Sequence, residues 1–332
     1  RALVSQLSEP ITIIAVVISV TVGLGMLELT VGALFGFLYV ITRVVFLVQI
    51  ITSSRNEFKA SEPSFEQIFS LSDEAKINKE HSGNKKVMSL EQGIEFENLN
   101  FSYKEDLIAL NKINLSIPKG KMIAIVGPSG SGKSTLIDLI MGFQVPDSGK
   151  ILIDGKNLNE IELLSWRELV GYIPQQPFLF NSSINENLKW ANENASQTDI
   201  NNACKLANAS EFISDLEEGY DTVIGERGLK LSGGQAQRLC LARALVRDQE
   251  ILILDEATSS LDSNSEKLIQ DSIDNLTGQK TIISVAHRLS TIKNADLIYY
   301  LYAGEIVEKG TFEELVKDKE GHFFRAAKLQ GV

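Results

Sequence analysis

The clearest candidate for chemistry is a glycine-rich run near the middle of the chain, GPSGSGKST, which matches the phosphate-loop pattern G-x-x-x-x-G-K-[ST] in full. The short apolar segment MIAIV comes before it, and the apolar segment TLIDLIMG continues from its last residue. In such a loop the backbone N–H groups point inward at phosphate, and the start of the following helix favours an anion. The run predicts a nucleoside triphosphate site formed by Gly127, Pro128, Ser129, Gly130, Ser131, Gly132, Lys133, Ser134 and Thr135.

Four charged or hydroxyl side chains could carry out hydrolysis at this site. Lys133 can reach the terminal phosphates, and the Ser134 hydroxyl can bind Mg²⁺. The aliphatic run ILIL ends in Asp255 and Glu256, so a buried strand would deliver two carboxylates at its end. Asp255 would hold Mg²⁺, and Glu256 would polarise a water for attack on the γ-phosphate. A Gly/Ser turn and an ordinary carboxylate pair are the structural alternatives, but together the two motifs predict an NTPase.

A second candidate anion site opens the long helical segment LKLSGGQAQRLCLARAL. Serine is a good N-cap, glycine allows close approach to the backbone, and the start of a helix favours an anion. Ser232, Gly233, Gly234 and Gln235 occupy this position. Since the chain already has a phosphate loop, these residues alone leave open whose phosphate the second site holds.

The elements that would position these residues follow a strand and helix rhythm from about residue 93. The segments IEFENLNF and KINLSI alternate apolar and polar residues, as an antiparallel pair does. Further strands are expected at MIAIV, ILILD, TIISVAH, DLIYYL and EIVEKG, with helical segments between them. This order predicts an α/β domain with a largely parallel core sheet and an antiparallel edge.

The N-terminal part of the chain has a different composition. Residues 10–52 are apolar apart from Glu28 and Arg43, and the run is about twice the roughly 20 residues that one helix needs to cross a bilayer. We therefore predict two membrane spans, 10–27 and 29–52, joined by a tight turn at Glu28. A signal peptide is the alternative.

Charge and composition beyond the spans set the remaining boundaries. Arg1 precedes the first span and Arg55 and Lys59 follow the second, which places both ends in the cytoplasm. We assign residues 1–71 to a partial transmembrane domain with a cytoplasmic extension, residues 72–92 to a polar linker and residues 93–332 to the nucleotide-binding domain. The net charge of −11 argues against a nucleic-acid partner, whose binding site would be basic.

The signature LSGGQ at residues 231–235 makes the chain resemble the ATP-binding cassette (ABC) proteins over its whole length. The resemblance implies a P-loop NTPase fold with a RecA-like core, an antiparallel β subdomain and a helical subdomain, which binds ATP and Mg²⁺. Four more motifs occur in the order of that family: FSYKED, GYIPQQP, SSLD and SVAHRLS.

These motifs imply roles by resemblance. Tyr103 would stack on adenine, with packing in the core as the alternative. Gln175 would sense the γ-phosphate and Mg²⁺; Gln176 competes for this role, but the register IPQ favours Gln175. Asp262 lies at the D-loop, and His287 would contact the γ-phosphate, with a buried core histidine as the alternative.

The resemblance also implies an answer for the second anion site. In ABC proteins the signature of one copy closes over the ATP that the loop of another copy holds, so Ser232, Gly233 and Gly234 would cap the γ-phosphate of a partner. We therefore expect a second ABC subunit, identical or different, as a partner of this chain.

The order of hairpin and cassette resembles half-transporter exporters, in which six spans precede the cassette. The two predicted spans resemble the last two, so this chain alone, without the first four, is not expected to transport. We expect a multi-pass protein in the lipid of a plasma or inner membrane, with its cassette in the cytoplasm. The substrate stays unknown, although the cassette resembles lipid or lipid-linked oligosaccharide flippases. A non-transporting ABC ATPase, as in DNA repair or translation, and an interaction fragment are the alternatives.

Overall fold

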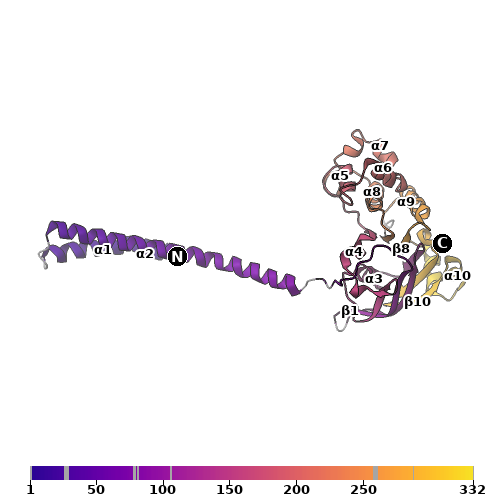
Figure 1. Cartoon of the computed structure of the whole chain (residues 1–332), viewed down its shortest axis with the longest axis horizontal. Coiled ribbons are helices and arrows are strands. Elements are labelled where there is room, and N and C mark those ends of the chain that lie inside the picture. The colour runs from indigo at the N-terminus through magenta and orange to yellow at the C-terminus, as the bar shows by residue number, and fades with distance from the viewer. Residues whose placement is uncertain are drawn as a thin grey trace. The chain divides into compact units, whose positions relative to one another are not determined.

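A computed structural model describes residues 2–25, 30–77, 80, 82–104, 107–256, 261–286 and 288–331. The chain divides into two compact units, Arg1–Lys79 and Glu80–Val332, which are described separately (Figure 1). The first unit holds helices α1 (Ala2–Gly25) and α2 (Val31–Ile77), which contact each other. The turn predicted at Glu28 lies outside the described residues.

Part of the predicted membrane hairpin meets the length and composition of a span in the residues that the structure describes. One helix, Val31–Lys76, is long and apolar enough to cross a membrane, and it contains residues 31–52 of the predicted second span. The first predicted span contains the shorter apolar helix Ile13–Gly23. Large apolar side chains of α2, such as Phe35 and Ile51, are about two-thirds exposed. Because such exposure on one helix is costly in water, it favours an apolar environment for α2.

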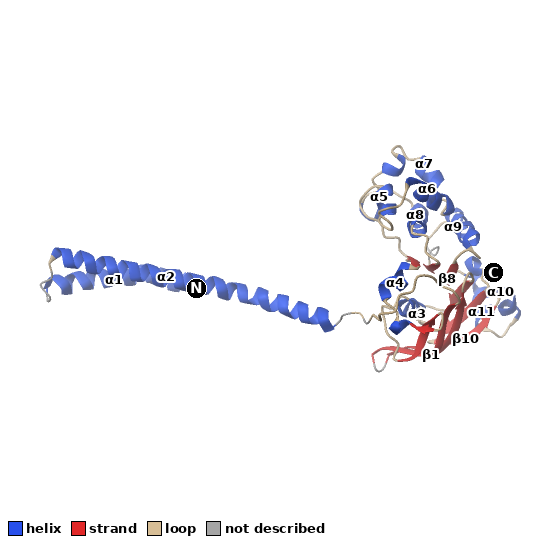
Figure 2. Ribbon diagram, in the orientation of Figure 1, coloured by secondary structure: helices blue, strands red, loops and turns tan. Residues whose placement is uncertain are grey.

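The second unit contains two sheets (Figure 2). The first is antiparallel, in the order β2-β1-β4-β5, with β1 Gly93–Lys104, β2 Leu107–Pro118, β4 Ser148–Ile153 and β5 Lys156–Asn157. The second has the order β10-β9-β3-β8-β7-β6, with β3 Met122–Val126, β6 Val170–Ile173, β7 Ile251–Asp255, β8 Thr281–Ala286, β9 Leu297–Tyr302 and β10 Glu305–Gly310. All its strands pair in parallel except β10 with β9. The predicted parallel core with an antiparallel edge is confirmed.

Helices of the second unit fall into two groups. Those beside the sheets are α3 Lys133–Ile140, α4 Leu163–Glu168, α10 Phe312–Lys317 and α11 His322–Gln330. The others lie between β6 and β8 in the chain. They are α5 Ile184–Lys189, α6 Gln197–Leu206, α7 Ser210–Ser214, α8 Gly233–Val246 and α9 Ser263–Leu276. Figure 2 shows α5 to α8 gathered at one end, apart from the strands, where the expected helical subdomain would be.

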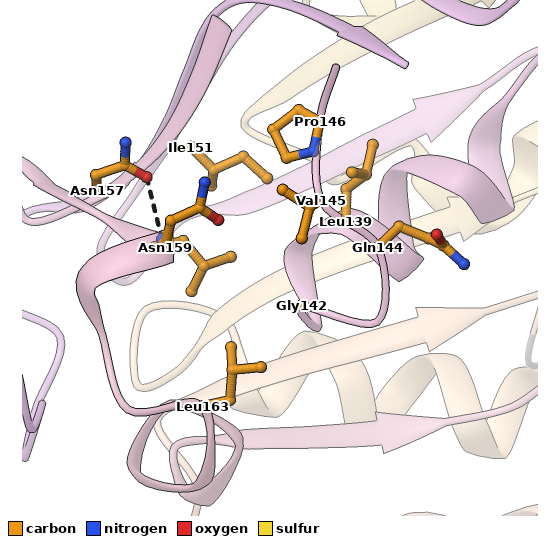
Figure 3. A pocket seen from close by; sticks show the side chains of 10 residues that line it. Leu139, Gly142, Gln144, Val145, Pro146, Ile151, Asn157, Asn159 and Leu163 are labelled. Atoms are coloured by element: carbon orange, nitrogen blue, oxygen red, sulfur yellow. Dashed lines mark hydrogen bonds between the residues drawn. The ribbon is translucent and has the colours of Figure 1, made fainter. Parts of the chain in front are cut away.

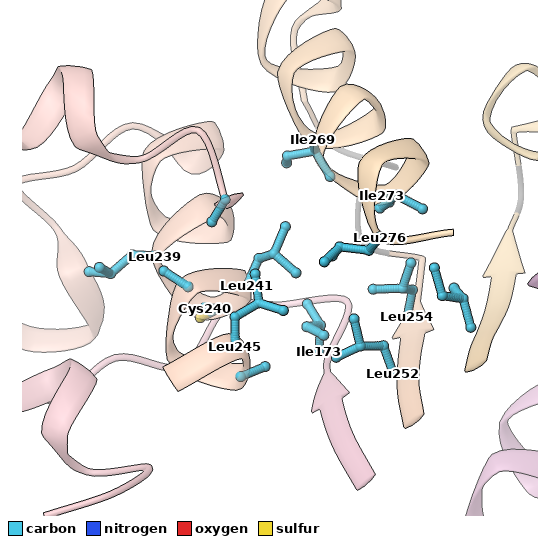
Figure 4. Close-up of a cluster of buried hydrophobic side chains, with 14 of the residues drawn as sticks. Ile173, Leu239, Cys240, Leu241, Leu245, Leu252, Leu254, Ile269, Ile273 and Leu276 are labelled. Atoms are coloured by element: carbon cyan, nitrogen blue, oxygen red, sulfur yellow. The ribbon is translucent and has the colours of Figure 1, made fainter. Parts of the chain in front are cut away.

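Alternate residues of β3 enter two different cores, since successive side chains of a strand point to opposite faces. Ile123 and Ile125 join α3 and the antiparallel sheet on one face, while Met122, Ala124 and Val126 join the opposite core. That second core includes α8 and α9, whose leucines and isoleucines pack on β6 and β7 (Figure 4). Burial of each such side chain stabilises the fold by about 1.5–3 kcal/mol. Both faces of β3 are thereby buried.

Residues 72–92, predicted to be a polar linker, have two parts in the structure. Helix α2 continues through them to Ile77. From Glu80 onward the chain belongs to the second unit and hydrogen-bonds to residues 160–167. Composition does not reveal this pairing, because it is made largely by backbone groups.

Candidate functional site

The phosphate loop joins β3 to α3, and two of its glycines cannot be replaced without strain. Gly127 has φ +155°, and a Cβ there would lie 2.0 Å from the Leu301 carbonyl oxygen. Gly132 has φ +106°, and its Cβ would lie 2.7 Å from the Ala109 carbonyl oxygen. Backbone carbonyls of neighbouring strands lie against the loop at both positions, so only glycine can adopt these conformations there without a clash.

Lys133 lies across the mouth of this loop. Its Nζ donates to the carbonyl oxygens of Gly127 and Pro128, each at 2.9 Å. Burial lowers the pKa of Lys133, and the negative charges of Glu256 and Asp255 partly oppose this shift. The Lys133 ammonium is therefore held by loop carbonyls within electrostatic reach of the two predicted carboxylates.

One open pocket of about 310 Å³ joins the phosphate loop to distant predicted site residues. Tyr103 from β1 and Glu256 from the end of β7 line it together with Lys133, Ser134 and Thr135. Tyr103 is 49% exposed, which rules out the alternative that it is a core residue. Its hydroxyl lies 3.1 Å from Thr135 Oγ1, so the ring stands at the edge of the loop.

The predicted carboxylates meet Gln175 at the carboxyl ends of β6 and β7. Because these strands are parallel neighbours, the residues after them lie at the same edge of the sheet. Gln175 Nε2 donates to Glu256 Oε2 at 2.6 Å. Glu256 itself has φ +49°, an uncommon conformation for a residue other than glycine. Such strain at a strand end is typical of functional sites.

Sequence reasoning missed Tyr172, whose hydroxyl donates to Asp255 Oδ2 at 3.0 Å. Burial is the main cause that raises the pKa of Tyr172, and Asp255 raises it further, so the phenol stays protonated and can donate. Burial is also the main cause that raises the pKa of Asp138 in α3, and the negative charge of Asp255 raises it further. The position of Tyr172, in the strand directly before Gln175, was the only available signal.

The donor set at this edge suits Mg²⁺. Ser134, Asp255 and Gln175 offer hydroxyl, carboxylate and amide oxygens, the hard ligands that Mg²⁺ prefers. Within the described residues no cluster of three or more His, Cys, Asp or Glu side chains could hold a metal by itself. Mg²⁺ does not require such a cluster, since it is usually bound through one or two carboxylates together with substrate phosphates.

The signature residues form a well-capped helix start. Ser232 Oγ accepts from the Gln235 backbone N–H at 3.2 Å, and Gln235 Oε1 accepts from the Ser232 N–H at 2.9 Å. This capping box begins α8. Among the described residues, neither Ser232 nor its neighbours line the pocket of the phosphate loop. The structure therefore separates the two predicted phosphate-binding elements of one chain.

Asp262 and His287 complete the predicted set. Asp262 is the N-cap of α9 and accepts from the N–H groups of Ser265 at 3.0 Å and Asn264 at 3.1 Å. The Ser265 backbone bond is the largest cause that lowers the pKa of Asp262. His287 lies outside the described residues and directly follows β8, which ends at Ala286.

Gly234 is where the signature helix approaches α9. A Cβ there would lie 2.2 Å from Ser265 Oγ, whereas at Gly233 the nearest atom, Leu261 Cδ2, is 3.6 Å away. We expect Gly234→Ala to lower the free energy of unfolding by about 1–3 kcal/mol relative to Gly233→Ala, because it overpacks this contact. Denaturant unfolding measures both, and Ser265→Gly in the Gly234→Ala background should recover most of the loss. Equal stabilities of the two alanine variants would contradict the close approach.

Comparisons with known proteins give one consistent family. Residues 110–259 match the family model described as ABC transporter. A heterocyst differentiation ATP-binding protein, HepA, of Nostoc sp. is 40% identical over 96% of this chain and 52% of its own length. An ATP-dependent lipid A-core flippase of Syntrophus aciditrophicus is 40% identical over 91% of this chain and 50% of its own.

A plant relative and a solved structure agree with these matches. ABC transporter B family member 14 of Arabidopsis thaliana is 46% identical over 77% of this chain and 21% of its own length. A bacterial Atm1-family ABC exporter with ATP bound matches all of this chain and 59% of its own, with a TM-score of 0.89 and 32% identity. The chain thus spans about half, or less, of the length of these curated relatives.

Proposed function

This chain carries an ATPase domain of the ABC transporter family, and on that premise we propose that it is the ATP-binding and ATP-hydrolysing part of an ABC exporter. The observation that carries the proposal is the pocket in which Tyr103, the phosphate loop and Glu256 converge. An aromatic ring, a cradle of N–H groups and a carboxylate are the three things that adenine, phosphates and an attacking water require.

We assign roles to the residues that line this pocket and to those beside it according to their positions. The loop N–H groups and Lys133 bind the phosphates, while Tyr103 presents its exposed ring to the base. Ser134, Asp255 and Gln175 would hold Mg²⁺, which neutralises charge on the phosphates when it is bound. Tyr172 keeps Asp255 in place through its hydroxyl.

Glu256 is the proposed general base, and Gln175 sets its direction. The 2.6 Å bond from Gln175 Nε2 orients the carboxylate, and a carboxylate positioned in this way can accept a proton from water. His287 follows β8 beside β7 and is proposed to contact the γ-phosphate. Asp262, as the N-cap of α9, fixes the start of that helix.

The site of one chain is incomplete, and a second ABC subunit supplies the rest. The capped start of α8 lines no part of the chain's own pocket among the described residues, yet it has the features of an anion site. We propose that Ser232, Gly233 and Gly234 of one subunit bind the γ-phosphate held by the other. The intact nucleotide then joins two cassettes, and its hydrolysis releases them.

Membrane location and substrate follow from α2 and from the relatives. The exposed apolar side chains of α2 favour a lipid surrounding, with the cassette on the cytoplasmic side as the flanking basic residues predict. One relative is named a lipid A-core flippase, so we propose an amphipathic lipid as the substrate class. The closing and opening of two cassettes would drive its movement.

A mixing experiment tests the shared site. Lys133→Ala removes a phosphate ligand but keeps the signature, whereas Ser232→Arg blocks the signature but keeps the loop. We expect each variant of the whole chain, in detergent, to be inactive as an ATPase. An equimolar mixture should recover up to about a quarter of the wild-type rate. Half of the randomly formed pairs then contain one chain of each variant, and each mixed pair has one complete site out of two.

The same measurement separates the alternatives. A mixture that stays as inactive as its components would contradict a site built from two chains. A Ser232→Arg variant with the wild-type rate at every protein concentration would indicate an ATPase that works as a single molecule.

A further inference from the structure

Residues 80 and 82–87 form a strap that lies along the cassette. The N–H of Gly83 donates to the Ile161 carbonyl oxygen at 2.9 Å, and the N–H of Lys85 donates to that of Glu160 at 3.0 Å. The N–H of Glu162 returns a bond to the Lys85 carbonyl at 2.9 Å. A Cβ at Gly83 would lie 1.9 Å from the Glu160 carbonyl carbon, so the strap approaches as closely as backbones can. It is therefore a fitted part of this unit.

Arg167 joins this strap to the end of the phosphate-loop helix. Its Nη1 and Nη2 donate to the two carboxylate oxygens of Glu80, at 2.8 and 2.9 Å. Its Nε donates to the Met141 carbonyl at 2.9 Å, and Nη2 also reaches the Gly142 carbonyl at 3.2 Å. The guanidinium stacks over the Phe143 ring at 4.7 Å. The planar fork is thus fixed on both sides, and only 24% of the side chain is exposed.

Side chains of α4 bind the backbone at the C-terminal end of α3. Trp166 is fully buried, and its Nε1 donates to the Ile140 carbonyl at 2.7 Å. Together with Arg167 it binds three successive carbonyls, those of Ile140, Met141 and Gly142, at and just after the end of α3, where a helix leaves carbonyls without intrahelical partners. Figure 3 shows Gly142 opposite Leu163 of α4 at this end, where a Cβ on Gly142 would meet Leu163 Cδ2 at 2.5 Å. Movement of α3 therefore has to move or break these contacts.

Helix α3 has only eight residues, with the phosphate loop at one end and Arg167 at the other. A short helix in a packed core moves as a rigid body, because its hydrogen bonds and side chains leave no soft point between its ends. A displacement of its N-terminal end by bound phosphate would therefore also displace its C-terminal end. The strap follows α2 in the chain, since α2 ends at Ile77, three residues before Glu80.

We propose that Arg167 is a positioning residue that links nucleotide binding at α3 to the strap, so that the segment leading toward α2 responds to the nucleotide. The inference rests on the proposed nucleotide site at residues 127–135. Coupling between two sites is reciprocal, so displacement of the strap also changes the affinity for nucleotide.

Hydrogen exchange on the whole chain in detergent tests this link, with and without a non-hydrolysable ATP analogue and Mg²⁺. In the wild type we expect nucleotide to change the exchange rate of the amides of residues 83–85 by about fivefold or more, the lower end of allosteric coupling. Arg167→Ala should abolish that response. Glu80→Ala should abolish it too, while it leaves the bonds from Arg167 to Met141 and Gly142 in place.

Lys85→Ala is the matched control. Lys85 lies on the same strap and pairs with Glu160 at 2.6 Å. It makes no bond to α3, so the nucleotide response should persist in this variant. A purely structural role of Arg167 would raise exchange equally with and without nucleotide, and this result would overturn the proposal.

Nucleotide affinity, measured on the same samples, keeps the two proposals apart. Wild-type chain that binds the analogue with no change in strap exchange would overturn the link alone. Chain that binds no analogue at all would overturn the nucleotide site and the link with it.

Discussion

Glu256→Gln is expected to lower the ATPase rate by about 10²–10⁴-fold, the contribution of a general base, while ATP binding is kept. A glutamine has the same size and can still accept the bond that Gln175 Nε2 makes to Glu256 Oε2, so the site keeps its shape. What it lacks is a carboxylate that can take a proton from water. ATP should then hold two chains together without release, and size-exclusion chromatography in detergent should show an ATP-dependent dimer.

Glu250→Gln is the matched control, because Glu250 lies at the opposite end of the same strand, directly before β7. Glu250 Oε2 accepts from the Leu90 N–H at 3.0 Å, which a glutamine oxygen can also do. This variant should hydrolyse ATP at the wild-type rate. A Glu256→Gln chain that does the same would show that another group activates the water.

The phosphate loop could be read from the sequence because its chemistry is contiguous. Nine adjacent residues make the cradle, and the apolar segments on both sides predict the strand and helix that hold it. The bond between Gln175 and Glu256 joins residues 81 positions apart. It depends on β6 and β7 being parallel neighbours, which no local pattern specifies. The Tyr172 contact with Asp255 was missed for the same reason.

The fold was predictable where apolar residues mark buried strands, and it could not be predicted where backbone hydrogen bonds determine the pairing. The apolar strands gave the parallel sheet, and its order of strands came only from the structure. Residues 80–92 were expected to be linker because they are polar. Their order comes from N–H and C=O groups, from Gly83 and from one arginine 87 positions away from Glu80. Composition carries none of this information.

Lys133→Ala is expected to reduce strongly the stabilisation of the chain by nucleotide. Its ammonium, held between the Gly127 and Pro128 carbonyls, is the cation of the loop that faces the bound phosphates. Charge-assisted hydrogen bonds contribute about 1.5–3 kcal/mol, which corresponds to roughly 10- to 150-fold weaker binding without them. The melting temperature without nucleotide should change little, because burial already disfavours this charged group and lowers its pKa.

Thermal unfolding with and without Mg²⁺ and a non-hydrolysable ATP analogue measures both effects, since a ligand raises stability according to its concentration relative to Kd. Lys121→Ala is the control: Lys121 stands at the other end of β3 and pairs with Asp296 at 2.9 Å. It should lose little stability, as an exposed ion pair contributes only about 0–1 kcal/mol, and keep the full response to nucleotide. If Lys133→Ala responded as strongly as Lys121→Ala, the loop would bind phosphate through its backbone alone, and Lys133 would have no part in holding the nucleotide.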